Sequence, residues 1–129
     1  MIRMLVVCGL LMLTGCSQIP WRPDLGGALR QASRTNRLVV VAYWSAFDSQ
    51  CQEMERDVFS LQEVRDSLAE TIPVRIASWA DRKFAESYGI SKVPAFVVLG
   101  PDGRLLRMLQ GYVDEGRFRG MIEAARLNQ

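Results

Sequence analysis

The apolar run from Leu38 to Trp44 (LVVVAYW) constrains the fold of this chain more than any other feature. It is rich in β-branched residues and shows no alternation of polar and apolar side chains, as expected for a strand covered on both faces. A helix-like segment that begins near Asp48 or Ser49 follows it after a short break. A buried strand leading into a helix favours an α/β fold, with helices on both sides of a sheet.

Periodicity and turn residues predict the order helix, strand, helix, strand, helix, strand, strand, helix, with the second helix interrupted near residues 58–60. The alternation of the early strands with helices predicts right-handed crossovers and parallel pairing, closed by an antiparallel hairpin. The expected helices and their caps are 25–36 after Asp24, the segment from 48 or 49, 61–70 with a capping box from Ser60 to Glu63, 82–88 between Asp81 and Gly89, and 114–127. The expected strands are 38–44, 73–79, 95–99 and 104–109, the last two joined by a turn at 101–103.

The first residues have the layout of a secretory signal peptide, with Arg3 followed by a short apolar run. The sequence LTGC, from Leu13 to Cys16, resembles the cleavage box of bacterial lipoprotein signal peptides. This resemblance implies that residues 1–15 are removed and that Cys16 carries diacylglycerol, which anchors the protein in a membrane. The alternative is an ordinary signal peptide in which this cysteine is incidental. Residues 16–23, with Pro20 and Pro23, are then expected to form a lipidated tether.

The same resemblance predicts a location in the bacterial cell envelope, facing the periplasm. Ser17 follows the lipidated cysteine, and in lipoproteins of enterobacteria a residue other than aspartate at this place favours the outer over the inner membrane. Loss of Arg3 with the signal leaves 15 basic against 14 acidic residues, one fewer than the 16 basic residues of the whole chain. This balance gives no reason to expect nucleic acid as a partner.

The chain has no histidine and three cysteines. The absence of histidine excludes every mechanism that depends on a Ser-His or Cys-His pair or on histidine ligands. Cys8 is lost with the signal and Cys16 is lipidated, so Cys51 is the one thiol expected in the mature protein, where no internal disulfide can form. We expect no cofactor, and an Asp-x-x-Cys metal site with one thiolate and one carboxylate is a poor ligand set, so no metal is expected.

The order of elements, the cysteine at a helix start and the Val-Pro pair before the hairpin resemble the thioredoxin superfamily. The segments EMERDVFS and GYVDEGRF match the family's first active-site helix and its turn into the last helix. The resemblance covers roughly residues 24–127 and implies a thioredoxin-like three-layer domain over 24–129, with a central mixed sheet flanked by helices and a C-terminal β-hairpin and helix. It also implies an ancestry in thiol-disulfide exchange.

The chain departs from the family at the residues that carry the chemistry. The family's motif is W-C-x-x-C, and here it is replaced by Phe47, Asp48, Ser49, Gln50 and Cys51. The attacking cysteine is absent, and Cys51 stands at the place of the resolving one, which reacts only after a mixed disulfide has formed. Many members carry a buried acid in the first core strand, and its place is held by Ala42. We therefore do not expect ordinary dithiol turnover.

Two interpretations remain for each residue of the motif. Asp48 is either a helix N-cap or a charge partner of Cys51, and as a nearby carboxylate it would disfavour the thiolate. Cys51 is either a small buried core residue or a redox-active thiol that accepts glutathione or a partner's cysteine.

The resemblance also implies a peptide-binding groove. Pro94 matches the family's cis-proline, and the backbone of Val93 would pair with an extended substrate chain. Phe47, with Trp44 and Trp79, either lines this groove or belongs to the core.

Three functions are compatible with this pattern. The first is a membrane-anchored binding module that docks a protein partner or an extended peptide through the groove around Asp48, Cys51 and Pro94. The second is a thiol-disulfide oxidoreductase or redox sensor that acts through the single thiol of Cys51. The third is a structural envelope lipoprotein whose groove binds nothing. Exposure of the Cys51 sulfur discriminates between the first two.

Overall fold

The computed structural model describes residues 18–129. These residues form a domain built around one sheet of four strands, in the order β2-β1-β3-β4. The strands are β1 (Val39–Trp44), β2 (Ile72–Ala77), β3 (Ala95–Leu99) and β4 (Leu105–Gln110). β1 pairs parallel with β2 and antiparallel with β3, and β3 pairs antiparallel with β4. The mixed sheet and the closing hairpin are those predicted from the sequence.

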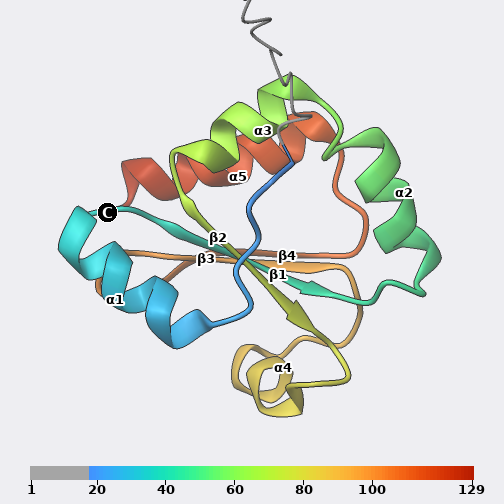
Figure 1. Ribbon diagram of the computed structural model, residues 1–129, viewed down its shortest axis with the longest axis horizontal. Helices are drawn as coiled ribbons and strands as arrows, with labels where there is room; N and C mark the ends of the chain where they lie inside the picture. The colour runs from blue at the N-terminus through green and yellow to red at the C-terminus, as the bar shows by residue number, and fades with distance from the viewer. Residues whose placement is uncertain (1–17) are drawn as a thin grey trace, which may run out of the picture.

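Five helices cover the two faces of this sheet (Figure 1). α2, α3 and α5 lie on one face, and α1 and α4 on the other. The helices are α1 (Leu25–Thr35), α2 (Ser49–Asp57), α3 (Gln62–Ala69), α4 (Arg82–Tyr88) and α5 (Glu115–Leu127). The predicted three-layer α/β fold is therefore confirmed.

The position of β1 in the middle of the sheet explains why its sequence is continuously apolar. Every residue of β1 is buried. Val40, Ala42 and Trp44 face a core shared with α2, α3 and α5, whereas Val39 and Val41 face a second core beneath α1 and α4. A strand with helices on both faces has no side that tolerates polar residues.

Two of the four predicted N-terminal caps are present and two are not, whereas the predicted C-terminal cap Gly89 is present, with a left-handed backbone (φ 64°). Asp48 caps α2 and Asp81 caps α4 through a hydrogen bond from the amide of Phe84. The predicted capping box at Ser60 is wrong, because the Ser60 hydroxyl donates to the carbonyl of Arg56, and α3 begins after Leu61 without a side-chain cap.

Asp24 precedes α1, as predicted, but does not cap it with its side chain. Its carboxylate instead forms an ion pair with Arg22, at 3.1 Å between Oδ2 and Nη2. A carboxylate committed to a neighbouring guanidinium is not available to the first amides of the helix.

The segment before α1 lies against the sheet rather than free of it. Arg22 forms a parallel β-bridge with Val74 at the outer edge of β2, with its amide 3.0 Å from the carbonyl oxygen of Pro73. Ile19 and Trp21 pack against the core on the side of α2 and α3. Within the segment predicted as a tether, residues 19 to 22 therefore contact the domain.

The predicted signal peptide, Cys16 and Ser17 lie outside the described residues. Within residues 18–129, none of the helices has both the length and the apolar character needed to cross a membrane.

Candidate functional site

The first turn of α2 is held by the side chain of Asp48. Its Oδ1 accepts hydrogen bonds from the amides of Gln50, at 2.9 Å, and of Cys51, at 3.0 Å. Asp48 has extended backbone angles (φ −79°, ψ 134°), as an N-cap residue requires. The structure agrees with the N-cap interpretation of Asp48. Amides that would otherwise face an anion at this helix start are already satisfied.

Cys51 lies in the first turn of α2 and exposes none of its surface. It belongs to the same core as Ala42, which is also completely buried on β1. Burial raises the pKa of the Cys51 thiol to about 11, and the negative charge of Asp48 acts in the same direction, against a backbone hydrogen bond at Ser45 and the charge of Arg75. At neutral pH the residue is therefore a protonated thiol.

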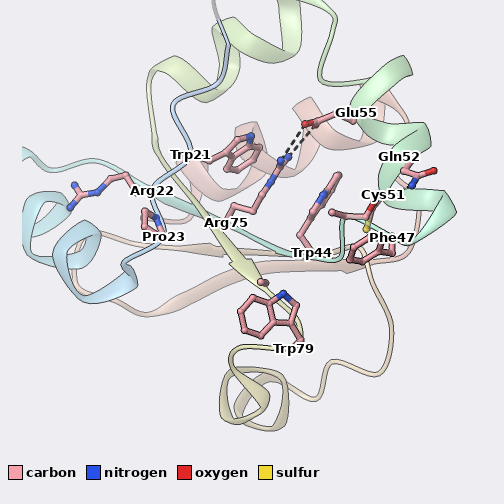
Figure 2. Close-up of a pocket in the computed structure, with 12 residues that line it drawn as sticks. Trp21, Arg22, Pro23, Trp44, Phe47, Cys51, Gln52, Glu55, Arg75 and Trp79 are labelled. Atoms are coloured by element: carbon pink, nitrogen blue, oxygen red, sulfur yellow. Dashed lines mark hydrogen bonds and ion pairs between the residues drawn. The ribbon is translucent and has the colours of Figure 1, made fainter.

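A cavity of about 600 Å³ lies between the start of α2, the segment before α1 and the end of β2. Figure 2 shows its residues, with aromatic side chains on several sides. Phe47 and Trp79, both at its border, are 93% and 84% exposed, which is unusual for large apolar side chains. The principal lining residues are Trp21, Trp44, Phe47, Cys51, Arg75 and Trp79.

Arg75 lies at the back of this cavity between two indole rings. Its guanidinium carbon is 4.5 Å from the ring centroid of Trp21 and 4.2 Å from that of Trp44. The two terminal nitrogens donate to the carboxylate of Glu55 at 3.1 and 3.2 Å. The Nε atom is buried and has no hydrogen-bond partner among the described residues. Trp21, Glu55 and Arg75 could not be predicted as site residues from the sequence, because their contacts join distant segments.

The residues predicted to form a peptide groove do not all line the same cavity. The Val93–Pro94 peptide bond is cis. Val93 lines a second cavity of about 480 Å³ together with Tyr43 and Ile90, and Pro94 lines neither that cavity nor the larger one.

The start of α2 and the Pro94 loop are nevertheless linked. The side-chain oxygen of Gln50 accepts a hydrogen bond from the amide of Tyr112 at 3.3 Å. The preceding residue, Gly111, donates its amide to the carbonyl of Pro94 at 2.7 Å. Asp48 and Pro94 thus lie at the same end of the sheet, whereas Phe47 and Cys51 contribute to the larger cavity.

The described residues contain no cluster of three or more histidine, cysteine, aspartate or glutamate side chains arranged to hold a metal ion. Around Cys51 the polar groups are a capping carboxylate and an arginine that is already paired. What this arrangement offers chemically is an apolar cavity with one buried thiol behind it.

Comparison with known proteins gives one consistent result. The family model described as the thioredoxin-like domain matches residues 25–126. The chain is 28% identical over 109 residues to the thiol:disulfide interchange protein DsbD 2 of Pseudomonas aeruginosa, a match that covers 80% of this chain and 19% of that protein. The chain thus spans about a fifth of the length of this curated relative.

Solved structures share the fold. A thioredoxin from Thermus thermophilus has a TM-score of 0.76 and 23% identity, over 86% of this chain and 89% of that one. A putative disulphide-isomerase from Bacteroides thetaiotaomicron has a TM-score of 0.73 and 16% identity, over 86% and 95% of the two chains. The DsbH oxidoreductase has a TM-score of 0.71 and 12% identity, over 86% and 87%.

Proposed function

The chain belongs to the thioredoxin-like domain family, and from this premise we propose that it is an envelope lipoprotein that binds a protein partner without catalysing dithiol-disulfide turnover. The proposed binding face is the end of the sheet that carries Asp48, Cys51 and the Val93–Pro94 loop. The proposed anchor is a diacylglyceryl group on Cys16, with the domain facing the periplasm. One observation carries the proposal: the single thiol of the domain is fully buried behind a helix start that an aspartate already caps.

Each chemical requirement of disulfide exchange is weakened at this site. A thiolate must first attack the target disulfide, and Asp48 stands where the family has that thiol. The remaining thiol has a pKa raised to about 11 by burial, so its thiolate fraction at neutral pH is very small. Ala42 supplies no carboxyl group to accept its proton. A groove that recognises backbone atoms does not depend on any of these groups and persists without them.

A second candidate function is supported by the family itself. The curated relative is a thiol:disulfide interchange protein, and Cys51 borders the large cavity in which Arg75 favours a negative charge. A movement of α2 that opened this cavity would expose the sulfur to glutathione or to a partner's cysteine. Under this alternative the protein is an oxidoreductase or a redox sensor that forms mixed disulfides through Cys51.

The rate of Cys51 alkylation against pH discriminates between the two functions. We expect labelling of the folded protein to be slow below about pH 8, and to become rapid at the same pH after unfolding in urea. Mass spectrometry of peptides separates Cys51 from Cys8 and Cys16. Rapid labelling of the folded protein at neutral pH would favour the alternative.

Catalysis is tested directly by the reduction of insulin. We expect no turnover above that of the Cys51→Ser variant, and no disulfide-linked partner of Cys51 trapped in cells. Turnover that disappears in Cys51→Ser would refute the proposal.

A further inference from the structure

The outer edge of β2 carries two backbone groups that no described residue satisfies. The ladder with β1 uses the amides of alternate residues, as shown at its ends by Ile72, which donates to Leu38, and by Ser78, which donates to Trp44. The intervening residues, 73, 75 and 77, therefore direct their backbone groups away from β1. Among residues 18–129, the carbonyl of Arg75 and the amide of Ala77 have no hydrogen-bond partner on this side.

The same edge already accepts a short strand at its other end. The amide of Arg22 donates to Pro73 and the amide of Arg75 donates to Arg22, at 2.8 Å for the second bond. After this single bridge the chain turns away into α1, as Figure 1 shows for the segment before this helix. The unpaired groups of Arg75 and Ala77 begin where the Arg22 bridge ends, and unpaired strand edges are templates for strand addition.

The large cavity lies directly beside these two groups, since both Arg75 and Ala77 line it. Side chains of an added strand alternate between the two faces of the sheet. Those on the face of Arg75 and Ala77 would enter the cavity between Trp21, Trp44 and Trp79, whose walls are mainly apolar. Backbone pairing and a side-chain pocket thus lie next to each other, which is the arrangement of a strand-addition site.

We propose that an extended segment of a partner protein adds to β2 opposite Ile76, pairs with the carbonyl of Arg75 and the amide of Ala77, and places an apolar side chain in the cavity bordered by Trp79. This β2-edge site is separate from the Val93–Pro94 loop. It rests on the proposed function for the existence of a protein partner, and it identifies what that partner presents: an exposed strand with an apolar residue on one face.

A second copy of this chain does not fit the site as well. In a symmetric antiparallel pair centred on Ile76, Ser78 of the second copy would lie opposite Val74. That place is occupied by Arg22. A segment of a different protein that ends or turns near Arg22 avoids this collision.

The test uses the capped peptide acetyl-Thr-Leu-Thr-Leu-amide, which is short enough to end before the place opposite Val74 that Arg22 occupies, and the isotope-labelled protein, with NMR shifts of backbone amides as the readout. We expect saturable shifts at Ile76 and Ala77, and none with a matched peptide in which serine replaces both leucines. Two further probes carry N-methyl groups on either the threonine amides or the leucine amides. Only alternate amides face β2, so one methylated peptide must lose binding and the other must retain it.

The identity of the weakened probe gives the strand direction. If the peptide with N-methylated threonine amides loses binding, the added strand is parallel to β2. If the peptide with N-methylated leucine amides loses binding, the added strand is antiparallel. If both methylated peptides bind as well as the parent, backbone pairing does not occur and the inference is wrong. Shifts confined to Val93 and its neighbours, or no shifts with any probe, would also overturn it.

Substitutions in the protein provide an independent check. Ala77→Pro removes the edge amide at a position equivalent to Pro73, which β2 already accommodates with its nitrogen facing outwards. We expect Ala77→Pro to weaken binding by about three- to tenfold, the effect of one hydrogen bond, while Ala77→Ser, which keeps the amide, binds like the wild type. Trp79→Ala, at a largely exposed position, should also weaken binding without affecting folding. If Ala77→Pro and Trp79→Ala bind the peptide as tightly as Ala77→Ser and the wild type do, the inference is wrong.

The two proposals fail in different ways. Reduction of insulin through Cys51 would refute the non-catalytic role, but it would not change the meaning of peptide-induced shifts at Ala77, which test the β2-edge site alone. Peptide shifts at Val93 without shifts at Ala77 would refute the β2-edge site and leave partner binding at the Asp48–Pro94 face intact.

Discussion

The carboxylate oxygen Oδ1 of Asp48 lies 3.0 Å from the backbone nitrogen of Cys51. One side chain therefore caps α2 and also places a negative charge beside the only thiol among the described residues. The two effects are separable, because an uncharged amide can cap a helix as well as a carboxylate does.

The capping role predicts the effect of two substitutions at Asp48. Asp48→Ala should lower the free energy of unfolding by about 1 kcal/mol, because two amides in the first turn of α2 lose their acceptor. Asp48→Asn should retain most of that stability. Urea unfolding of the wild type and the two variants measures the difference. An equal loss of unfolding free energy in both variants would show that the charge of Asp48, and not its hydrogen bonds to the helix amides, stabilises α2.

The pKa of Cys51 predicts a dependence of stability on alkaline pH. The pKa is raised from 9.0 to about 11 in the folded state, so the unfolded chain loses this proton first. The contribution of the protonated Cys51 thiol to the free energy of unfolding is complete below about pH 9. It is lost as the pH rises to about 11, and the total loss is about 2 to 3 kcal/mol.

Comparison with Cys51→Ala isolates this contribution from those of all other groups in the protein. The variant should be less stable at pH 7 because a buried side chain is shortened, but its unfolding free energy should fall less steeply above pH 9. Parallel pH profiles for the two proteins would indicate that the thiol is not shielded from water.

Restoring the missing thiol should create redox chemistry on this scaffold. In Asp48→Cys the new sulfur would stand at the start of α2, where free amides and the helix dipole favour a thiolate. We expect a reversible disulfide with Cys51, detected by mass spectrometry, and measurable reduction of insulin with dithiothreitol as the electron source. Asp48→Ser is the matched control and should remain inactive. Failure to form the disulfide would mean that α2 holds Cys51 out of reach.

The Arg75 stack predicts unequal effects for the two partners of one ion pair. Glu55 is half exposed, so Glu55→Ala should cost about 0.2 to 1 kcal/mol. Arg75→Ala should cost more, about 1 to 3 kcal/mol, because it also removes the cation–π contacts with Trp21 and Trp44. Arg75→Lys should restore only part of this, since lysine lacks the planar group that lies between the rings. Equal costs at Glu55 and Arg75 in urea unfolding would contradict this account.

Local features of this fold could be predicted from the sequence, and Asp48 and Asp81 illustrate why. Each is a capping residue whose partners lie within three positions along the chain, so neighbouring residues alone determine the contact. The buried strand β1 was equally predictable, because burial on both faces leaves a continuous apolar run. The cap at Ser60 failed for a competing local reason, since its hydroxyl found a carbonyl one turn earlier.

Contacts between distant segments could not be predicted in the same way. Trp21 and Trp44 meet on either side of Arg75 only after β1 and β2 have paired and the first segment has crossed the sheet edge. The bridge at Arg22 was missed because Pro20 and Pro23 indicate an irregular segment, although Arg22, one of the two residues between them, still has both backbone groups available. The placement of Phe47 and Val93 in different cavities likewise depends on how the loops pack.

If Cys16 carries the proposed lipid, the contact of Trp21 with the domain limits the distance between the domain and the bilayer. Four residues lie between Trp21 and Cys16, and a fully stretched chain over these five Cα-to-Cα steps spans at most about 18 Å. With the proposed lipid on Cys16, this length is the greatest distance between the lipid attachment and Trp21. The aromatic cavity beside Trp21 would then be held close to the lipid headgroups, within reach of proteins that are themselves seated in or on the same leaflet.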